Sequence, residues 1–193
     1  MHYPGSMQAV SFKFRRAFLR DLTEADRAAF IEYQNDPRYL QLYDFERGTE
    51  RPSRLFDLFL KWQREEPRAN YQLGIFDSFT GRLLGCGGLR RRDDSEAVLG
   101  IELAPSEWGR FRLALDTSTA LVQYGFGTLN LKKIIGETAS GNRRVEKLAR
   151  WLGAEIVDRR AGPDWMQTRG WEEVDWAITK QAWMQAEQRL TSA

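Results

Sequence analysis

Hydrophobic and polar positions alternate in short runs at the start of the chain and then change to helical spacing. The segment 10–22, VSFKFRRAFLRDL, predicts a first strand. Thr23, with Asp26 three residues later, has the pattern of an N-cap with a capping box and predicts a helix that Pro37 ends. A second helix is expected to stop near Pro67, with one apolar face made by Leu55, Phe56, Phe59 and Trp62.

The pattern changes after residue 70, where turn-rich segments separate three short apolar runs, YQLGIFD, RLLGCGGLR and AVLGIELA. These runs predict an antiparallel meander of three strands. Next come a helix with an apolar face, a strand LKKIIGETA, a helix from Asn142 that closes on Gly153, and two last strands, AEIVDRR and EEVDWAITK. Because helices and strands do not alternate strictly, we expect an α+β fold with one mixed, mostly antiparallel central sheet flanked by helices.

Length and composition limit the class of protein. The 193 residues, 42% hydrophobic and 29% charged, suit one globular domain, which we expect to span residues 10–193 after a flexible N-terminus at 1–9. The net charge of +2 requires no nucleic-acid partner. A single cysteine, Cys86, allows no internal disulfide and fits a cytoplasmic protein. With His2 as the one histidine, the common zinc sites are excluded, and no apolar run is long enough to span a membrane.

Five local strings, taken in order, resemble the GCN5-related N-acetyltransferase (GNAT) superfamily, and within it the RimJ/RimL-like branch of ribosomal-protein alanine acetyltransferases. The strings are LRDLTEADRAAFIEYQNDPRYL, GRLLGCGGLR, LGIELAPSEWGR, NLKKIIGETASGN and GWEEVDWAITKQAW. Each is short and degenerate, but their joint order and spacing are specific. The resemblance covers nearly the whole chain, from Phe12 to Trp183, and implies the acyl-CoA N-acyltransferase fold.

The resemblance implies that an amine attacks the thioester of acetyl-CoA directly. The amine must first lose a proton to a base or a water chain, and the oxyanion then needs a positioned N–H donor. The family takes that donor from the fourth strand, here around Leu103 and Ala104. Glu102 is the candidate base, displaced by four residues from Val98, where the family's usual acid falls. Alternatively, Glu102 is a structural residue paired with one of the arginines at 90–92.

The segment 108–114 falls where the family binds the pyrophosphate of CoA with a glycine-rich loop and a helix N-terminus. The signature glycine is missing, because one alignment puts Phe111 and Leu113 at the two small positions and another puts Arg112 and Ala114 there. Two interpretations follow. Either Arg110 and Arg112 bind the phosphates themselves, or the loop has closed and both side chains are solvated.

Asn142 corresponds to a family asparagine that contacts the pantetheine arm or orients the site. The tyrosine with which many members protonate the leaving thiolate corresponds to Ala149, and the serine of some members to Val145, so both usual general acids are absent. Water can serve instead, because the thiol is acidic. The candidate coenzyme-binding residues are Leu103, Ala104, Trp108, Gly109, Arg110, Phe111, Arg112, Leu113, Ala114 and Asn142.

The sequence therefore predicts an acyl-CoA-dependent N-acyltransferase, most simply an N-acetyltransferase. In it, Glu102 relays the acceptor's proton and the Leu103 backbone stabilises the oxyanion. The expected co-substrate is acetyl-CoA or another acyl-CoA, and the acceptor is an amine on a small molecule or a protein N-terminus; a homodimer is also compatible with the family. The alternative is a catalytically weak or inactive fold that acts as a binding or regulatory module. Trp62, Trp165 and Trp171 either flank an acceptor cleft or pack in the core.

Overall fold

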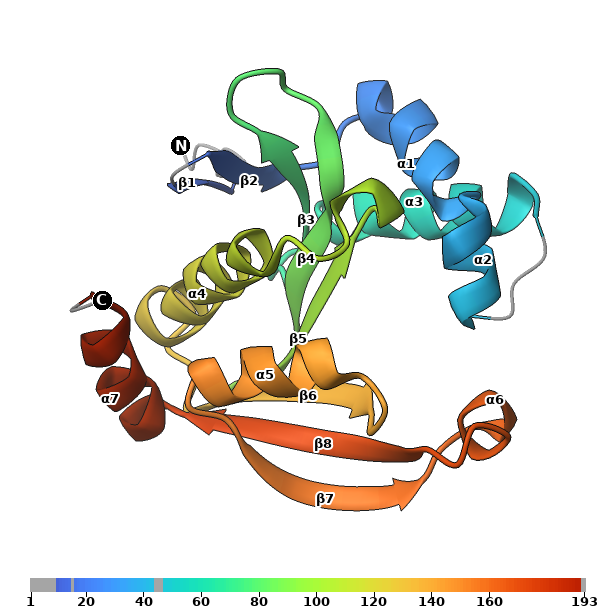
Figure 1. The fold of residues 1–193 in the computed structure, drawn as a ribbon. Helices are drawn as coiled ribbons and strands as arrows, with labels where there is room; N and C mark the ends of the chain where they lie inside the picture. The colour runs from blue at the N-terminus through green and yellow to red at the C-terminus, as the bar shows by residue number, and fades with distance from the viewer. Residues whose placement is uncertain (1–9, 15, 44–46, 192–193) are drawn as a thin grey trace, which may run out of the picture.

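The computed structural model describes residues 10–14, 16–43 and 47–191, so the expected flexible terminus at 1–9 lies outside the described residues. Within them, eight strands form one sheet in the order β1-β2-β3-β4-β5-β6-β8-β7 (Figure 1). Only the β5–β6 pair is parallel. The strands are β1 (Ser11–Phe14), β2 (Ala17–Asp21), β3 (Asn70–Asp77), β4 (Leu83–Arg91), β5 (Glu96–Leu103), β6 (Lys133–Ala139), β7 (Glu155–Ala161) and β8 (Glu172–Thr179).

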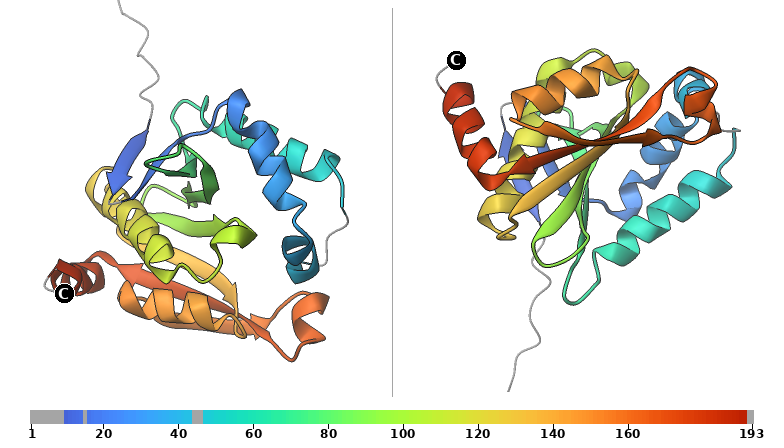
Figure 2. Two further views of the ribbon diagram at one scale, coloured as in Figure 1. Left: turned by 45° about the horizontal axis from the view of Figure 1, so that its top comes forward. Right: turned by 90° about the horizontal axis from the view of Figure 1, so that it is seen from below.

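Helices cover both faces of this sheet, with α1, α2 and α3 on one side and α4 on the other (Figures 1 and 2). The helices are α1 (Arg27–Gln34), α2 (Pro37–Tyr43), α3 (Glu50–Trp62), α4 (Phe111–Gly127), α5 (Arg143–Trp151), α6 (Asp164–Gln167) and α7 (Lys180–Thr191). Two 3-10 turns, η1 (Glu24–Asp26) and η2 (Pro105–Glu107), precede α1 and α4. The expected α+β class with a mostly antiparallel sheet is therefore confirmed.

The two helical layers bury different side chains of the same strands, because successive residues of a strand point to opposite faces. On the α1–α3 side, Phe30 and Phe56 pack with Phe76 and Cys86 in one buried cluster. On the α4 side, the buried clusters contain Leu73, Ile75, Leu113 and Leu121, together with a second group from α4, β6, β8 and α7. The sheet therefore separates a face that carries α1–α3 from a face that carries α4, α5 and α7.

Local sequence signals place several element ends correctly. The carboxylate of Asp26 accepts the backbone N–H of Thr23 at 2.8 Å, which confirms the predicted capping box at the start of η1. Asn142 is the N-cap of α5, and its Oδ1 accepts the N–H of Val145 at 3.3 Å. Gly153 follows α5 with φ of +76°, the left-handed conformation that glycine adopts at low cost.

Other element boundaries differ from the sequence-based expectation. The single strand expected at 10–22 is a hairpin of β1 and β2. Pro37 begins α2 instead of only ending the helix before it, because proline lacks the N–H that the first turn of a helix leaves unpaired. The second helix ends at Trp62, five residues before Pro67. Two further helices, α6 and α7, were not predicted from the sequence.

No helix among residues 10–14, 16–43 and 47–191 is both long enough and apolar enough to cross a bilayer.

Candidate active site

The parallel strands β5 and β6 pair only from Glu96–Lys133 to Val98–Ile135 and then diverge (Figure 1). β5 continues to Leu103 beside β4, while β6 continues to Ala139 beside β8. The backbone of 99–103 therefore has no strand paired with it on the β6 side, and we call this unpaired side of β5 the opening.

The direction of the backbone groups in β5 follows from its pairing with β4. The N–H of Ala104 donates to the carbonyl of Leu84 at 2.8 Å, so this group is already engaged in the sheet. Antiparallel pairing alternates along a strand, and the N–H and C=O of Leu103 consequently point away from β4, into the opening. The indole N–H of Trp108 donates to the Leu103 carbonyl at 2.9 Å. Of the two residues expected to stabilise an oxyanion, Leu103 is the one whose N–H points into the opening.

The side chain of Glu102 lies on the opposite face of β5 from α4, among side chains of α1 and α2. Three donors hold its carboxylate: Tyr33 Oη to Oε1 at 2.8 Å, Gln34 Nε2 to Oε1 at 2.5 Å, and Tyr39 Oη to Oε2 at 2.5 Å. Arg51 Nη2 in turn donates to Gln34 Oε1 at 2.9 Å. The first two helices thus position this carboxylate at the end of β5.

Burial raises the pKa of the Glu102 carboxyl above its ordinary value, and the hydrogen bonds from Tyr39, Tyr33 and Gln34 offset only part of this effect. Burial likewise raises the pKa of both Tyr33 and Tyr39, with the negative charge of Glu102 adding to the effect, so both hydroxyls stay protonated and donate. A carboxylate with a raised pKa is a better proton acceptor than an exposed one. The site is therefore suited to general-base chemistry.

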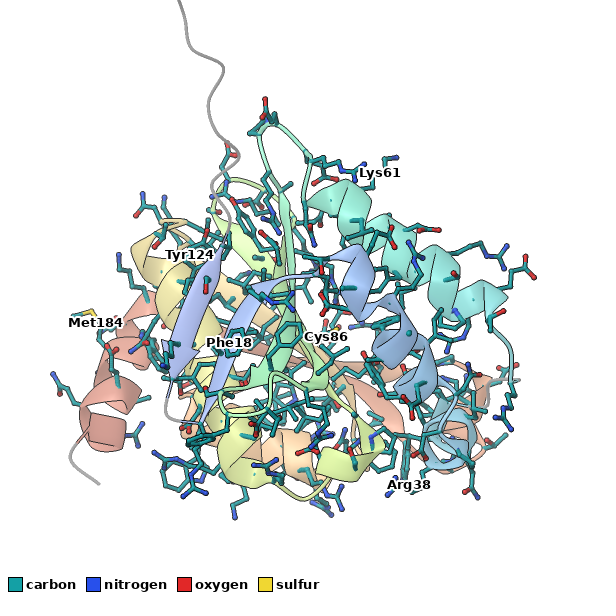
Figure 3. The ribbon with its side chains drawn as sticks, turned by 90° about the horizontal axis from the view of Figure 1, so that it is seen from above. Phe18, Arg38, Lys61, Cys86, Tyr124 and Met184 are labelled. Atoms are coloured by element: carbon teal, nitrogen blue, oxygen red, sulfur yellow. The ribbon has the colours of Figure 1, made fainter. Side chains whose placement is uncertain are left out.

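The alternative in which Glu102 pairs with one of the arginines at 90–92 is wrong. Glu102 lies opposite Cys86 in the β4–β5 register, whereas Arg90 lies opposite Val98 and Arg91 opposite Ala97. Arg92 instead pairs with Glu137 and Glu96. Cys86 is buried at the α1 side of the sheet, with its Sγ 3.5 Å from the hydroxyl of Tyr33 (Figure 3). It belongs to the packing beneath Glu102.

A glycine in β4 allows β5 to approach closely at Glu102. Gly85 has φ of +151°, and a Cβ built on it would lie 2.1 Å from the carbonyl oxygen of Glu102 and 2.8 Å from the Cα of Leu103. Both distances are far below van der Waals contact. β4 carries a bulge at this point, because Ile75 pairs with Gly85 and Phe76 with Leu83. Gly85 and this bulge together set the position of the Glu102–Leu103 backbone.

The buried carboxylate of Glu107 holds the turn before α4, and this residue was not predicted as part of the site. Glu107 is 2% exposed and accepts Arg82 Nη2 at 2.6 Å and Arg110 Nη1 at its other oxygen. Burial acts to raise the pKa of this carboxyl, but the two arginines outweigh burial, and the pKa is lowered. Gly109, with φ of +95°, makes the turn into the helix. Arg110 is therefore tied to Glu107 instead of being merely solvated.

The first turn of α4 differs from a phosphate-binding loop in its side chains and in its backbone. The N–H of Phe111 donates to the Gly109 carbonyl at 2.8 Å, and the N–H of Leu113 donates to the Arg110 carbonyl at 3.0 Å. Leu113 is 7% exposed and packs under the helix, while Ala114 is only partly buried. Arg112 Nε pairs with Asp116 at 3.0 Å. Both candidate phosphate-binding arginines thus already have acidic partners.

The Phe111 ring points toward α5. Lys147 Nζ lies 4.7 Å from the centroid of this ring, and the ring of Trp151 is 6.4 Å away at an interplanar angle of 62°. Phe111 therefore occupies the space between the N-terminus of α4 and the side of α5.

The tryptophans proposed as acceptor-site residues lie in different parts of the molecule. Trp62 packs against Phe59 at 5.5 Å on the α3 side of the core. Trp171 lies against Gly141, where a Cβ would meet its ring at 2.1 Å, and thereby joins the loop before β8 to the start of α5. Trp165 belongs to α6, at the same end of the molecule as α2 (Figures 1 and 2). Trp62 therefore packs against the cluster that includes Tyr33, a hydrogen-bond partner of Glu102, while Trp165 lies with α6 at the end of the molecule where α2 is.

Four residues of the site were not predicted from the sequence: Tyr33, Gln34, Tyr39 and Glu107. Tyr33 and Gln34 lie in the recognised helix α1, but their contacts with Glu102 span 69 and 68 residues, and helical periodicity does not predict such contacts. Glu107 carried one available signal, since a carboxylate three residues before Arg110 favours a local ion pair.

A family model described as an acetyltransferase (GNAT) domain matches residues 16–155. The chain belongs to the GNAT acetyltransferase family. No curated protein sequence matches the chain.

Solved structures of GNAT proteins share the fold at low sequence identity. Spermidine N-acetyltransferase from Vibrio cholerae, in complex with CoA and spermine, has a TM-score of 0.73 and 20% identity over 88% of this chain and 98% of its own. The ribosomal-protein-S5-alanine acetyltransferase from Vibrio fischeri has a TM-score of 0.74 and 15% identity over 90% and 98%. A GNAT acetyltransferase from Bacillus anthracis has a TM-score of 0.70 and 17% identity over 89% and 99%.

Proposed function

We propose that this GNAT protein is an N-acetyltransferase that transfers the acetyl group of acetyl-CoA directly to a primary amine. The observation that carries the proposal is the opening between β5 and β6, where the N–H of Leu103 faces a space that no strand fills. A backbone donor of this kind stabilises the oxyanion that forms when an amine attacks a thioester carbonyl. The indole of Trp108 holds the same peptide segment through the Leu103 carbonyl.

The two faces of the sheet give the two substrates separate approaches. The thioester reaches the opening from the side of α4 and α5, where the helix N-terminus after Gly109 favours the negative charge of the coenzyme. The amine reaches it from the side of α1 and α2, where Glu102 lies. The two reactants then meet at the backbone of Leu103.

Glu102 removes a proton from the acceptor amine, either directly or through a water molecule. The amine nitrogen attacks the acetyl carbonyl, and the oxyanion forms beside Leu103 N–H. The nitrogen, now cationic, loses its second proton to solvent water, and the C–S bond breaks as the carbonyl re-forms. The thiolate takes a proton from solvent water, since the two positions that carry general acids in relatives hold Ala149 and Val145, and Glu102 releases its proton to solvent. Tyr33 and Tyr39 keep the carboxylate aimed at the opening through their hydrogen bonds.

The amine acceptor and the branch of the family are part of the proposal. Structural likeness to a spermidine N-acetyltransferase that holds spermine supports a small-molecule amine. Likeness to a ribosomal-protein alanine acetyltransferase supports the RimJ/RimL-like branch and a protein N-terminus as the other acceptor class. Both acceptor classes present a primary amine that is protonated at neutral pH and needs a base.

The test combines binding with transfer. The protein is incubated with acetyl-CoA and a panel of polyamines, amino acids and N-terminal peptides, and products are identified by mass spectrometry. We expect at least one acceptor to gain one acetyl group, and Glu102→Gln to lower the rate while acetyl-CoA affinity stays within about twofold of the wild type, since the carboxylate lies on the other face from the coenzyme. Absence of acetyl-CoA binding by the wild type would refute the proposal.

A further inference from the structure

Helix α5 carries two parallel rows of cationic side chains with different surroundings. Arg143 and Arg150 both pair with Glu146, at 3.1 and 2.9 Å. Arg144 and Lys147 lie on the neighbouring row, three residues apart, and both are exposed. Among the residues that the structure describes, neither forms an ion pair with a carboxylate. We call Arg144, Lys147 and Trp151 the α5 row.

The α5 row faces the N-terminus of α4. Lys147 Nζ lies 4.7 Å from the centroid of the Phe111 ring, and Trp151 contacts the same ring edge to face at 6.4 Å. Phe111 is the first residue of α4, so the positive end of that helix lies beside these cations. Trp151 remains 43% exposed, so part of its indole is accessible to solvent.

Two backbone amides and two arginines at the start of α4 already have local partners in this chain. The amides of Phe111 and Leu113 donate to local carbonyls, Arg110 pairs with Glu107, and Arg112 pairs with Asp116. The Phe111 side chain also blocks the close approach that a glycine at this position would allow. On α5, Lys147 lies beside the Phe111 ring and Arg144 lies one turn before it on the same row, so a phosphate at the helix start has two cations without a described carboxylate partner on the neighbouring helix.

We propose that the α5 row binds the adenosine 3′,5′-bisphosphate end of the acyl-CoA substrate. Arg144 and Lys147 contact its phosphate oxygens, and the exposed face of Trp151 stacks on the adenine ring. Guanidinium and ammonium groups both pair with phosphate, and indole is a good stacking surface for a base. This inference rests on the proposed use of acyl-CoA, and it moves phosphate recognition from the loop backbone to side chains of another helix.

Two double variants with the same loss of charge test the assignment. Arg144→Ala with Lys147→Ala removes the cations of the α5 row, and Arg143→Ala with Arg150→Ala removes the paired cations of the neighbouring row. Calorimetric titration measures the affinity of each protein for CoA, dephospho-CoA and adenosine 3′,5′-bisphosphate. Thermal unfolding without ligand verifies that both variants are folded, and Trp151→Ala is measured in the same series.

We expect the Arg144/Lys147 variant to lose about tenfold in CoA affinity and to lose the preference of the wild type for CoA over dephospho-CoA. The Arg143/Arg150 variant should retain both. Trp151→Ala should weaken all three ligands by a similar factor, because each contains adenine. Equal losses in the two double variants would overturn the inference, since a general loss of positive charge would then explain them.

A wild-type protein that binds CoA and transfers acetyl groups, but binds dephospho-CoA equally well, would overturn the α5 assignment and leave the proposed function intact. A wild-type protein that binds neither compound would overturn both.

Discussion

The indole N–H of Trp108 donates to the carbonyl of Leu103 at 2.9 Å and thereby links the turn before α4 to the end of β5. Trp108 was expected to touch the coenzyme, yet its indole nitrogen is engaged with the strand that carries the proposed oxyanion donor. The contact makes the direction of the Leu103 peptide depend on the conformation of the coenzyme-side turn. Under the proposed function, Trp108 would therefore couple coenzyme binding at this turn to the alignment of the Leu103 N–H.

Trp108→Phe should lower kcat by about tenfold, less than the hundredfold or more that loss of a complete oxyanion donor costs. The phenyl ring retains most of the packing but cannot hold the Leu103 carbonyl. Steady-state kinetics with acetyl-CoA and the best acceptor measure the effect. Trp183→Phe is the control, because Trp183 is buried in the cluster that α7 forms with β8. An equal fall in kcat for both variants would contradict the role of Trp108.

Tyr39→Phe should move the acid limb of the kcat/KM profile to higher pH. Tyr39 donates to Glu102 Oε2, and this hydrogen bond favours the ionised carboxylate and lowers its pKa. Its removal raises that pKa further above the ordinary value, so a higher pH is needed before Glu102 can accept a proton. Tyr124→Phe, which alters a tyrosine packed against Phe12 and Tyr71, should leave the limb in place. A limb that moves to lower pH, or does not move, would remove Tyr39 from the account.

Gly85→Ala should destabilise the fold by about 2–5 kcal/mol, because the new Cβ would meet the Glu102 carbonyl at 2.1 Å in a backbone conformation that alanine rarely adopts. Gly127→Ala is the matched control: its Cβ would meet nothing within 4 Å at the end of α4, and its effect should stay within about 1 kcal/mol. Denaturant unfolding measures both. A neutral Gly85→Ala would show that β4 and β5 need not approach so closely.

Glu107→Gln should destabilise the protein at neutral pH by about 1–2 kcal/mol, because Arg82 and Arg110 lose a charged acceptor. The folded-state pKa of Glu107 is lowered, so its contribution is present above the ordinary pKa of 4.5 and disappears as the pH falls through the folded value. The difference between variant and wild type should therefore shrink in acid. Glu146→Gln, on the surface of α5, should have a smaller effect, and an equal or pH-independent effect of Glu107→Gln would contradict this assignment.

The local elements of the fold could be predicted from short-range patterns. Thr23 and Asp26 identified the start of the first helical turn, and alternating runs identified β3, β4 and β5. Pro37 misled the prediction because proline is compatible with both the end of one helix and the start of the next. Helix α7 was not predicted, although the spacing of Trp183 and Ala186, three residues apart, is compatible with one helix face, and both side chains are buried in the structure.

The site could be predicted only in part. Resemblance to the family pointed to residues 102–104 and to the segment before α4, but the hydrogen bonds from Tyr33 and Tyr39 to Glu102 depend on how two helices pack on a distant strand. The acidic partners of Arg110 and Arg112 are local, three and four residues away along the chain, and this spacing was an available signal. Their sequence neighbours suggested phosphate binding or solvation, whereas the structure pairs them with Glu107 and Asp116. Charge alone does not reveal whether a partner is already present.

The most direct test of direct acetyl transfer measures release of the CoA thiol from acetyl-CoA, with and without the best amine acceptor, for the wild type and Glu102→Gln. The account predicts release that depends on the amine, equals the amount of acetylated product, and falls sharply in Glu102→Gln although acetyl-CoA still binds. Release that is independent of the amine, or unchanged in Glu102→Gln, would contradict the assignment of Glu102 as the base for an attacking amine.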